Sequence, residues 1–258
     1  MDRGQASLSG QSEYGADFAR SRTARRGQKA TCGETEIVID GTAFVADLSG
    51  ALYWADEGLL AVADLHFEKG SAFAVHGMLL PPYDTASTIE RLAWIIAYYD
   101  PRTVIALGDN FHDGDGAARL RPEDRAALYS LQRGRDWIWI TGNHDPQPVL
   151  GVGGMFAEKI DCGSLHFRHE PSADATVSEV AGHLHPSATV RQRGRALTRR
   201  CFAASDRRLI LPAFGAYAGG LNIRHSAFTR VFGSPAFTVH LIGDRNIFSL
   251  PATRCRGE

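Results

Sequence analysis

Five short polar clusters hold the residues of this 258-residue chain that can do chemistry, and each directly follows an apolar run. They are Asp64-Leu65-His66, Gly108-Asp109-Asn110-Phe111-His112-Asp113, Gly142-Asn143-His144-Asp145, His169-Glu170-Pro171 and Gly182-His183-Leu184-His185. Since short apolar runs are typical of buried strands, we expect each cluster at the end of a sheet, where loops build the sites of layered α/β folds. The spacing of two in Asp64 and His66, and in His183 and His185, points both side chains to one side while the chain stays extended.

The ligand types in these clusters indicate a metal centre. Carboxylates, imidazoles and an amide oxygen, without a thiolate, suit catalytic rather than structural sites for manganese, iron or zinc. They outnumber the four ligands of a structural zinc site. Two divalent ions that share a bridging carboxylate would use all of these candidate ligands. Such a pair produces hydroxide at neutral pH and stabilises both the attacking and the leaving oxygen of an in-line phosphoryl displacement. Polar strand ends and core histidines explain any single cluster equally well, but not all five together.

The elements that must position the clusters begin as an alternation of strands and helices. Apolar runs at 59–63, 103–107 and 137–140 predict strands, and the patterns at 81–101 and 122–133 predict helices. From residue 164 onward strands dominate. This order predicts an α/β fold, in which a two-sheet β-sandwich is flanked by helices.

Local signals mark the helix ends and the turns. Asp84 or Ser87 is the candidate N-cap of the first helix, and Ser87 has capping-box spacing to Glu90. Pro122 suits the first turn of the second helix. Each of three glycines precedes a candidate ligand, at strand-to-loop turns where we expect a residue without Cβ to be needed: Gly108, Gly142 and Gly182.

Composition limits the partners and the location. Residues 1–33 are rich in Arg, Gly and Ser and are expected to form a flexible basic extension, with 34–258 as a single domain. A formal net charge of −1 excludes an overall attraction to nucleic acid or to an anionic membrane, so such binding requires a local basic patch. The four cysteines are scattered and no apolar run is long enough for a membrane span, which together favour a soluble cytoplasmic protein.

The motifs DLH, GDNFHD, GNHD, a later histidine and GHLH resemble, in this order over residues 59–186, the pattern of the calcineurin-like metallophosphoesterases. That resemblance implies a sandwich of two sheets with a dinuclear metal site at the sheet edge. It also implies a role for His144 in orienting the phosphate and assisting the leaving group. The implied ligands are Asp64, His66 and His185 for one ion and Asn143, His169 and His183 for the other, with Asp109 bridging.

A narrower resemblance covers residues 36–220. The stretches DLHFEKGSAFAVHGMLLPPYDT, GDNFHD, CF at 201–202 and LPAFGAYAGG are similar to the bacterial ligase-associated DNA-damage-response phosphoesterases, the PdeM family. This implies a metal-dependent endonuclease that acts on DNA, in a repair pathway shared with a DNA ligase and a helicase. Neither the N-terminal extension nor the segment beyond residue 235 belongs to the pattern.

His112 is the residue that favours a diester substrate. The order Phe111-His112-Asp113 resembles nucleases of the same superfamily, in which this histidine contacts the scissile phosphate. A second imidazole beside the metals can donate to a phosphate oxygen or protonate an alkoxide leaving group. The alternative is a hydrogen bond from His112 to Asp113.

Basic side chains near the clusters are candidate phosphate contacts. Arg191, Arg193 and Arg195 alternate, and in an extended segment they would line one face beside the metal site. The alternative is an exposed sheet edge whose charges oppose aggregation. Lys69 either reaches the phosphate or packs its stem on the surface.

Three functions follow in order of preference. The first is a dinuclear phosphodiesterase or endonuclease acting on DNA, with manganese as the expected ion and iron or zinc as alternatives. The second is a small-molecule or cyclic-nucleotide phosphodiesterase, which the near-neutral charge favours slightly. The third is a binding subunit without catalysis, and the complete ligand set argues against it.

Overall fold

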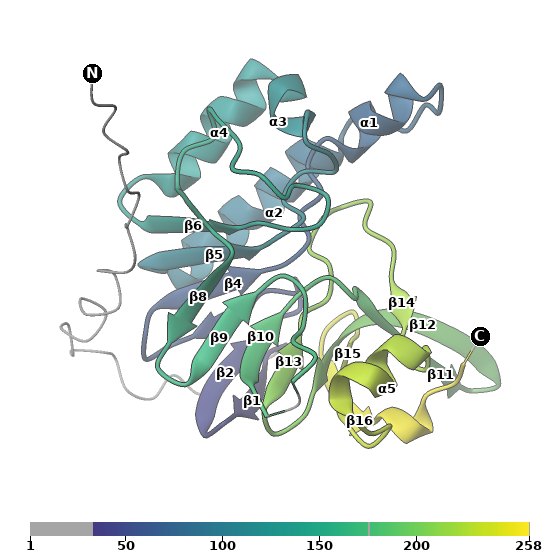
Figure 1. The fold of residues 1–258 in the computed structure, drawn as a ribbon. Helices are drawn as coiled ribbons and strands as arrows, with labels where there is room; N and C mark the ends of the chain where they lie inside the picture. Colours follow the sequence, from purple (N-terminus) through teal and green to yellow (C-terminus); the bar gives the residue numbers. More distant parts are fainter. Residues whose placement is uncertain (1–32, 175, 258) are drawn as a thin grey trace, which may run out of the picture.

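The structure is a computed structural model that describes residues 33–174 and 176–257. The extension predicted at 1–33 therefore lies, except for Gly33, outside the described residues, and the proposed domain division stays a prediction. Within the described part, two β-sheets pack face to face and helices cover their outer sides (Figure 1).

The first sheet has seven strands in the order β1-β2-β3-β4-β5-β6-β7 within the described residues. The strands are β1 (Thr35–Ile39), β2 (Thr42–Ala46), β3 (Leu52–Trp54), β4 (Leu59–Val62), β5 (Thr103–Leu107), β6 (Asp136–Ile140) and β7 (Met155–Ala157). β1 to β4 form antiparallel hairpins, and β4 to β7 are parallel. β4 and β5 are buried along their whole length, which explains why their sequences are continuous apolar runs.

Four helices belong to this half of the chain: α1 (Lys69–Val75), α2 (Asp84–Tyr99), α3 (Gly116–Arg119) and α4 (Pro122–Gln132). α2 and α4 lie in the crossovers that make β4, β5 and β6 parallel. Their apolar faces pack on the outer side of the first sheet, where Leu92 and Leu128 are buried with Trp137.

The second sheet contains nine strands among the described residues, with a main order of β14-β11-β12-β13-β10-β9-β8. β15 pairs with β12 and with β16. The strands are β8 (Lys159–Cys162), β9 (Leu165–Arg168), β10 (Ser178–Ala181), β11 (Pro186–Gln192), β12 (Arg195–Ala204), β13 (Arg208–Ile210), β14 (Leu221–Asn222), β15 (Thr238–Ile242) and β16 (Ile247–Pro251). Helix α5 (Ser226–Phe232) covers the outer side of this sheet, and a short 3-10 turn spans Ala252–Arg254.

The core between the sheets combines side chains from both of them. Phe44 and Ile105 of the first sheet are buried against Phe167 and Phe202 of the second. The layers are therefore helices, sheet, sheet and helix, which confirms the predicted sandwich with flanking helices. No helix in the described part of the chain is long and apolar enough to cross a membrane.

The start of α2 differs from the prediction. Tyr83 occupies the N-cap position, and no side chain caps the helix, so the expected caps and capping box are wrong. The Asp84 carboxylate instead accepts a hydrogen bond of 2.8 Å from the backbone N–H of Gly70 in α1. The Thr85 hydroxyl donates to the Glu68 carboxylate and accepts from the backbone N–H of Glu68, and both bonds are 2.9 Å long. The first turn of α2 thus fixes the loop that follows the first ligand pair.

Candidate metal centre

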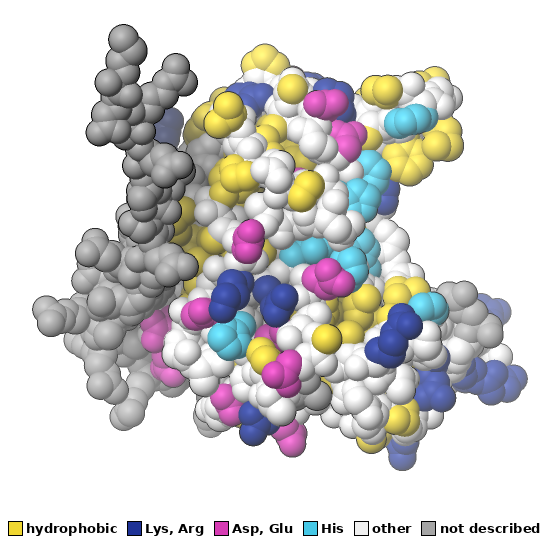
Figure 2. Space-filling view, viewed as in Figure 1, with side chains coloured by type: hydrophobic (Ala, Val, Ile, Leu, Met, Phe, Trp, Pro, Cys, Tyr) yellow, Lys and Arg dark blue, Asp and Glu magenta, His cyan; other side chains and the backbone are white. Residues whose placement is uncertain are grey.

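The five polar clusters converge at one edge of the sandwich. Three follow the parallel strands β4, β5 and β6 of the first sheet, and two follow the parallel strands β9 and β10 of the second. The carboxyl ends of parallel strands lie at the same end of their sheet, so the two sheets bring both groups together. Figure 2 shows histidine side chains gathered in the hollow between the helical side of the molecule and the second sheet.

One group of donors comprises Asp64, His66 and His185. The Nε2 atom of His185 lies 3.2 Å from Oδ1 of Asp64 and 3.3 Å from Nε2 of His66. Donors bound at 2.0–2.2 Å to one tetrahedral or octahedral ion are roughly 3 to 3.5 Å apart. These atoms therefore fit a common divalent ion, in agreement with the implied ligand set.

A second group surrounds the side-chain oxygen of Asn143. Its Oδ1 atom lies 3.0 Å from Nε2 of His169 and 2.9 Å from Nδ1 of His183, and the two nitrogens are 3.2 Å apart. Oδ1 of Asp109 is 3.3 Å from the same His169 nitrogen. Such mutual spacing of oxygen and imidazole donors fits a second ion.

The carboxylates lie between these two groups. Asp64 is close enough to share an ion with His66 and His185, and also with Asp109 and His169. Geometry thus makes Asp64 common to both three-residue groups, whereas the family resemblance implies that Asp109 bridges. The bridging role of Asp109 stays a prediction.

The backbone at the ligands is left-handed rather than extended. Among the described residues, five of the nine non-glycine positions with positive φ are candidate ligands: Asp64, His66, Asp109, His183 and His185. The assumption of an extended chain at the two ligand pairs was therefore wrong. Each left-handed residue costs about 1–2 kcal/mol, a cost that surrounding contacts must offset. Backbone bonds from His66 to Asp109 at 2.9 Å and from Asp64 to Gly108 at 3.2 Å hold this conformation.

The three glycines are needed mainly for space. Gly108 has φ of +76°, and a Cβ there would lie 2.5 Å from the ring of His169. Gly142 and Gly182 do not have positive φ, so the expected need for a residue without Cβ comes there from close contacts rather than from the backbone conformation. A Cβ on Gly142 would lie 2.2 Å from Oδ1 of Asp109, and one on Gly182 would lie 2.7 Å from Oδ2 of Asp64. The ligands themselves occupy the volume that a side chain would fill.

Burial and charge shift the pKa values of two candidate ligand histidines in opposite directions. Burial, with a further contribution from His185, lowers the pKa of His66 to about 3, which leaves the imidazole neutral and able to bind metal. Burial also acts to lower the pKa of His169, but its hydrogen bond to Asp109 and the charges of Asp64 and Asp109 outweigh this and raise the pKa to about 9. His169 donates from Nδ1 to the Leu107 carbonyl at 2.8 Å, which turns Nε2 toward the carboxylates.

Asp145 connects two of the ligand loops, a role that sequence reasoning missed. Its Oδ1 accepts from the backbone N–H of Gly142 at 2.9 Å. Its Oδ2 accepts from the backbone and side chain of Asn110, both at 2.9 Å, and from the backbone of Phe111 at 3.3 Å. Burial raises the pKa of this carboxyl, and the four bonds oppose the cost of burying its charge. The only sequence signal was its place directly after His144.

A family model for the calcineurin-like phosphoesterases matches residues 59–205. The chain belongs to the calcineurin-like phosphoesterase family. It is similar over 83% of its length to the whole solved chain of the Pseudomonas putida nuclease MPE, with 26% sequence identity and a TM-score of 0.65. The phosphoesterase Yfce from E. coli matches at 13% identity, covering 74% of this chain and 97% of that one, with a TM-score of 0.34. A search of curated proteins found no match.

His144 and His112 lie side by side at the metal centre of this phosphoesterase. Their ring centroids are 5.2 Å apart, and the planes are within 26° of parallel. His144 donates from its backbone N–H to Asp109 at 2.9 Å and from Nδ1 to the carbonyl of His112 at 2.8 Å. Asp113 forms an ion pair with Arg119 at 2.8 Å, and its charge also acts on His112. Nδ1 of His112 is buried without a partner in the described part of the chain.

Lys69 lies at the same centre. Its charge acts on both His66 and His112, and it lowers the pKa of each, after burial and other contributions. Its ammonium is 5.9 Å from the ring centroid of Phe73, and neither its contact with phosphate nor the packing of its stem is tested. Burial lowers the pKa of Lys69 itself. The structure thus places a cationic side chain close enough to His66 and His112 to act on both imidazoles.

The predicted arginine strip is in fact a hairpin tip. β11 and β12 pair through Gln192 and Arg195, and the two residues between them, Arg193 and Gly194, have φ of +48° and +83°. Positive φ at both positions is typical of a type I′ turn. Arg191 follows His185 by six residues along a strand, so the tip is roughly 20 Å from that ligand. The prediction that these arginines form an extended strip beside the metal site was therefore wrong. We call Arg191, Arg193 and Arg195 the basic hairpin.

The arrangement can perform phosphoester hydrolysis. Two divalent cations at the two donor groups would supply Lewis-acid chemistry and make hydroxide available at neutral pH. The Nδ1–H of His144 is committed to the His112 carbonyl, so Nε2 is left to hold or deliver a proton at a substrate oxygen. The imidazole of His112 lies beside that of His144, and the charge of Lys69 acts on His112.

Proposed function

We propose that this phosphoesterase is an endonuclease that hydrolyses phosphodiester bonds in DNA with two manganese ions. The observation that carries the proposal is the pair of imidazoles, His112 and His144, on one side of the metal centre. Hydrolysis of a phosphodiester breaks a P–O bond and expels an alkoxide, which needs a proton. Two adjacent imidazoles can share these tasks, one binding the phosphate and the other protonating the leaving oxygen.

DNA as the substrate is supported by two further observations. The chain is similar over most of its length to a solved nuclease. The basic hairpin offers three exposed guanidinium groups roughly 20 Å from the ligands, in a chain whose formal net charge is −1. Such a distance suits phosphates several nucleotides away from the cleaved bond rather than the bond itself.

The pathway and the ion are parts of the same proposal. The narrower sequence resemblance supports a repair role shared with a DNA ligase and a helicase. Oxygen and imidazole donors without thiolate support manganese over softer metals, with iron and zinc as the competing ions. The cytoplasmic location expected from composition stays a prediction.

Metal reconstitution tests the proposal. Metal-stripped protein is incubated with supercoiled plasmid and with bis(p-nitrophenyl) phosphate, with manganese, iron or zinc restored, and with His144→Ala alongside. We expect manganese to restore plasmid nicking and diester hydrolysis, and His144→Ala to lose at least 100-fold of the nicking rate, within the range of general acid–base catalysis. Hydrolysis of the small diester without any nicking would refute the DNA substrate and favour a small-molecule or cyclic-nucleotide phosphodiesterase.

A further inference from the structure

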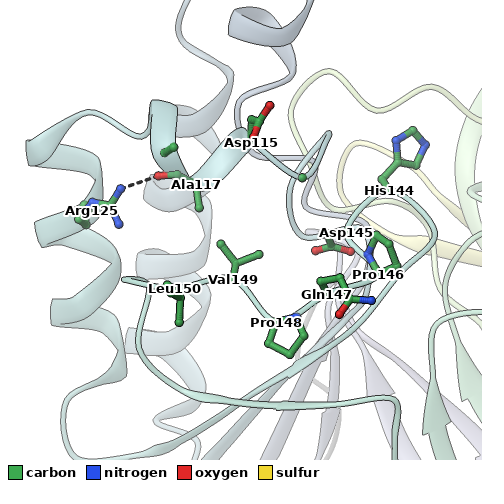
Figure 3. Close-up of a pocket in the computed structure, with 12 residues that line it drawn as sticks. Asp115, Ala117, Arg125, His144, Asp145, Pro146, Gln147, Pro148, Val149 and Leu150 are labelled. Atoms are coloured by element: carbon green, nitrogen blue, oxygen red, sulfur yellow. Dashed lines mark hydrogen bonds between the residues drawn. The ribbon is translucent and has the colours of Figure 1, made fainter.

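A cavity of about 570 Å³ opens next to His144, outside the two donor groups (Figure 3). Its walls come from the 114–118 segment around α3, from α4 through Arg125, and from the loop of residues 144–150 that follows β6. The volume lies within the range of small-molecule pockets. Because His144 and Asp145 belong both to this wall and to the metal-site loops, the cavity continues the catalytic centre on the His144 side.

The walls are suited to a flat, largely apolar group. Pro146 and Pro148 supply rigid rings, and Val149 supplies an aliphatic surface. The side-chain amide of Gln147 lies among them and offers both a donor and an acceptor. Apolar walls with a few polar groups that fix orientation are typical of sites for small organic ligands.

Arg125 brings a fixed guanidinium to the cavity. Its guanidinium donates to the backbone carbonyls of Ala117 and Gly151, one on each side, so the side chain is held in place before any ligand binds. A guanidinium can contact a nucleobase by stacking or by donating to an acceptor at its edge. Ordering this group in advance reduces the entropy cost of binding.

The charges of the cavity argue against a phosphate as its occupant. Asp115 brings an exposed carboxylate, while the Asp145 carboxylate is buried and already bound by four N–H donors. The one guanidinium has donors that are partly used by backbone carbonyls. A phosphate site needs an excess of positive charge or of free N–H donors. The ligand favoured here is an uncharged ring with polar edges.

We propose that this cavity is a nucleobase subsite, which binds the base of the nucleotide adjoining the scissile phosphate on the His144 side. The inference rests on the proposed function, since it assigns a further contact to the same nucleic-acid substrate. Base binding there would place the leaving nucleotide beside the loop that carries His144, whose imidazole points to the other side of that loop (Figure 3). It would favour single strands, whose bases are free to turn out of a stack.

Ala118→Trp tests the subsite, because Ala118 lines the cavity and is exposed, so that an indole enters the cavity without disturbing the core. The matched control is Ala126→Trp, an exposed alanine of α4 that does not line it. Both variants and the wild type are assayed on a single-stranded oligonucleotide with one labelled cleavage position. The same oligonucleotide is also assayed with an abasic residue next to that position, on either side in turn.

We expect the abasic residue on one side to slow wild-type and Ala126→Trp cleavage about tenfold, the scale of one lost base contact. Ala118→Trp should cleave the intact oligonucleotide about tenfold more slowly than wild type and lose no further rate on the abasic one. If Ala118→Trp cleaves both oligonucleotides at wild-type rates, or the abasic residue has no effect on the wild type, the subsite is refuted.

A binding experiment separates this inference from the proposed function. Saturation-transfer NMR on metal-free protein detects thymidine 5′-monophosphate, with deoxyribose 5-phosphate as the ligand that lacks a base. We expect wild type and Ala126→Trp to transfer saturation to the thymine protons, and Ala118→Trp to transfer none. This result supports the subsite even if no DNA is cleaved. Thymine saturation that is absent in wild type or unchanged in Ala118→Trp refutes it even if DNA is cleaved.

Discussion

Replacing Asp145 by Asn should weaken both the fold and the metal centre, although no ligand is touched. The carboxylate accepts four N–H bonds, one on Oδ1 from Gly142 and three on Oδ2 from Asn110 and Phe111. An amide has one oxygen, and its NH₂ group must face either the Gly142 donor or the Asn110 donors. In the better orientation the Gly142 bond is lost and the other three no longer have a charged acceptor.

The magnitude follows from these bonds. Losing a bond to a charged acceptor and leaving its buried donor unpaired costs about 1.5–3 kcal/mol. Burial raises the pKa of Asp145, which shows that its buried charge is itself unfavourable. Replacing the carboxylate by a neutral amide removes this penalty and offsets part of the lost hydrogen-bond energy. A net loss of about 2 kcal/mol in the free energy of unfolding corresponds to roughly 4–8 °C in Tm for a domain of this size. Because Gly142 adjoins Asn143, manganese affinity should fall about 10–100-fold, as for other residues that position ligands.

Calorimetric titration with manganese and thermal unfolding of the metal-free protein measure the two effects. Asp136→Asn is the control, because this exposed aspartate begins β6 at the end away from the metals. The reasoning is refuted if Asp145→Asn binds manganese with an affinity within twofold of wild type. A fall in Tm with unchanged affinity would limit Asp145 to a structural role.

Three further predictions concern other parts of the chain. Gly142→Ala places Cβ 2.2 Å from Oδ1 of Asp109 and should abolish binding of at least one ion in titration, whereas Gly219→Ala, with open space around it, should not. Burial lowers the pKa of His240 to about 4 in the folded protein, whereas the unfolded chain has the ordinary pKa of 6.5. Between these two pH values only the unfolded chain binds the proton, so the free energy of unfolding falls as pH decreases from about 6.5 toward 4. Between pH 7.5 and 5 the loss is about 2 kcal/mol, and His240→Gln should show a correspondingly smaller decrease in urea unfolding; an equal decrease would contradict this. Serine at all three positions of the basic hairpin should lower the slope of log affinity for long single-stranded DNA against log salt by about 0.7 per lost phosphate contact, while cleavage of a hexanucleotide stays unchanged; equal slopes would remove the hairpin from the DNA path.

The local pattern of the chain was sufficient for the central strands of the first sheet, for helices α2 and α4, and for the choice of candidate ligands. Buried parallel strands are short apolar runs with abrupt polar ends, so β5 was predicted with its observed bounds and β4 and β6 within one residue. The residue types at those ends restrict the chemistry to oxygen and imidazole donors for divalent metals. This information is local, which is why it could be found without any knowledge of contacts.

The tertiary structure decided which of these residues meet. Asp64 and His183 are 119 residues apart, and only the packing of two sheets brings the His183 N–H within 3.2 Å of that carboxylate. The part played by Asp145, and the space that requires glycine at 142, likewise depend on loops from separate strands. The basic hairpin shows the opposite case, because one Arg-Gly turn reverses the chain and moves a strip predicted beside the metals to a distant tip. A local pattern specifies side-chain types and periods, whereas distances depend on turns and on sheet packing, which join residues far apart in the chain.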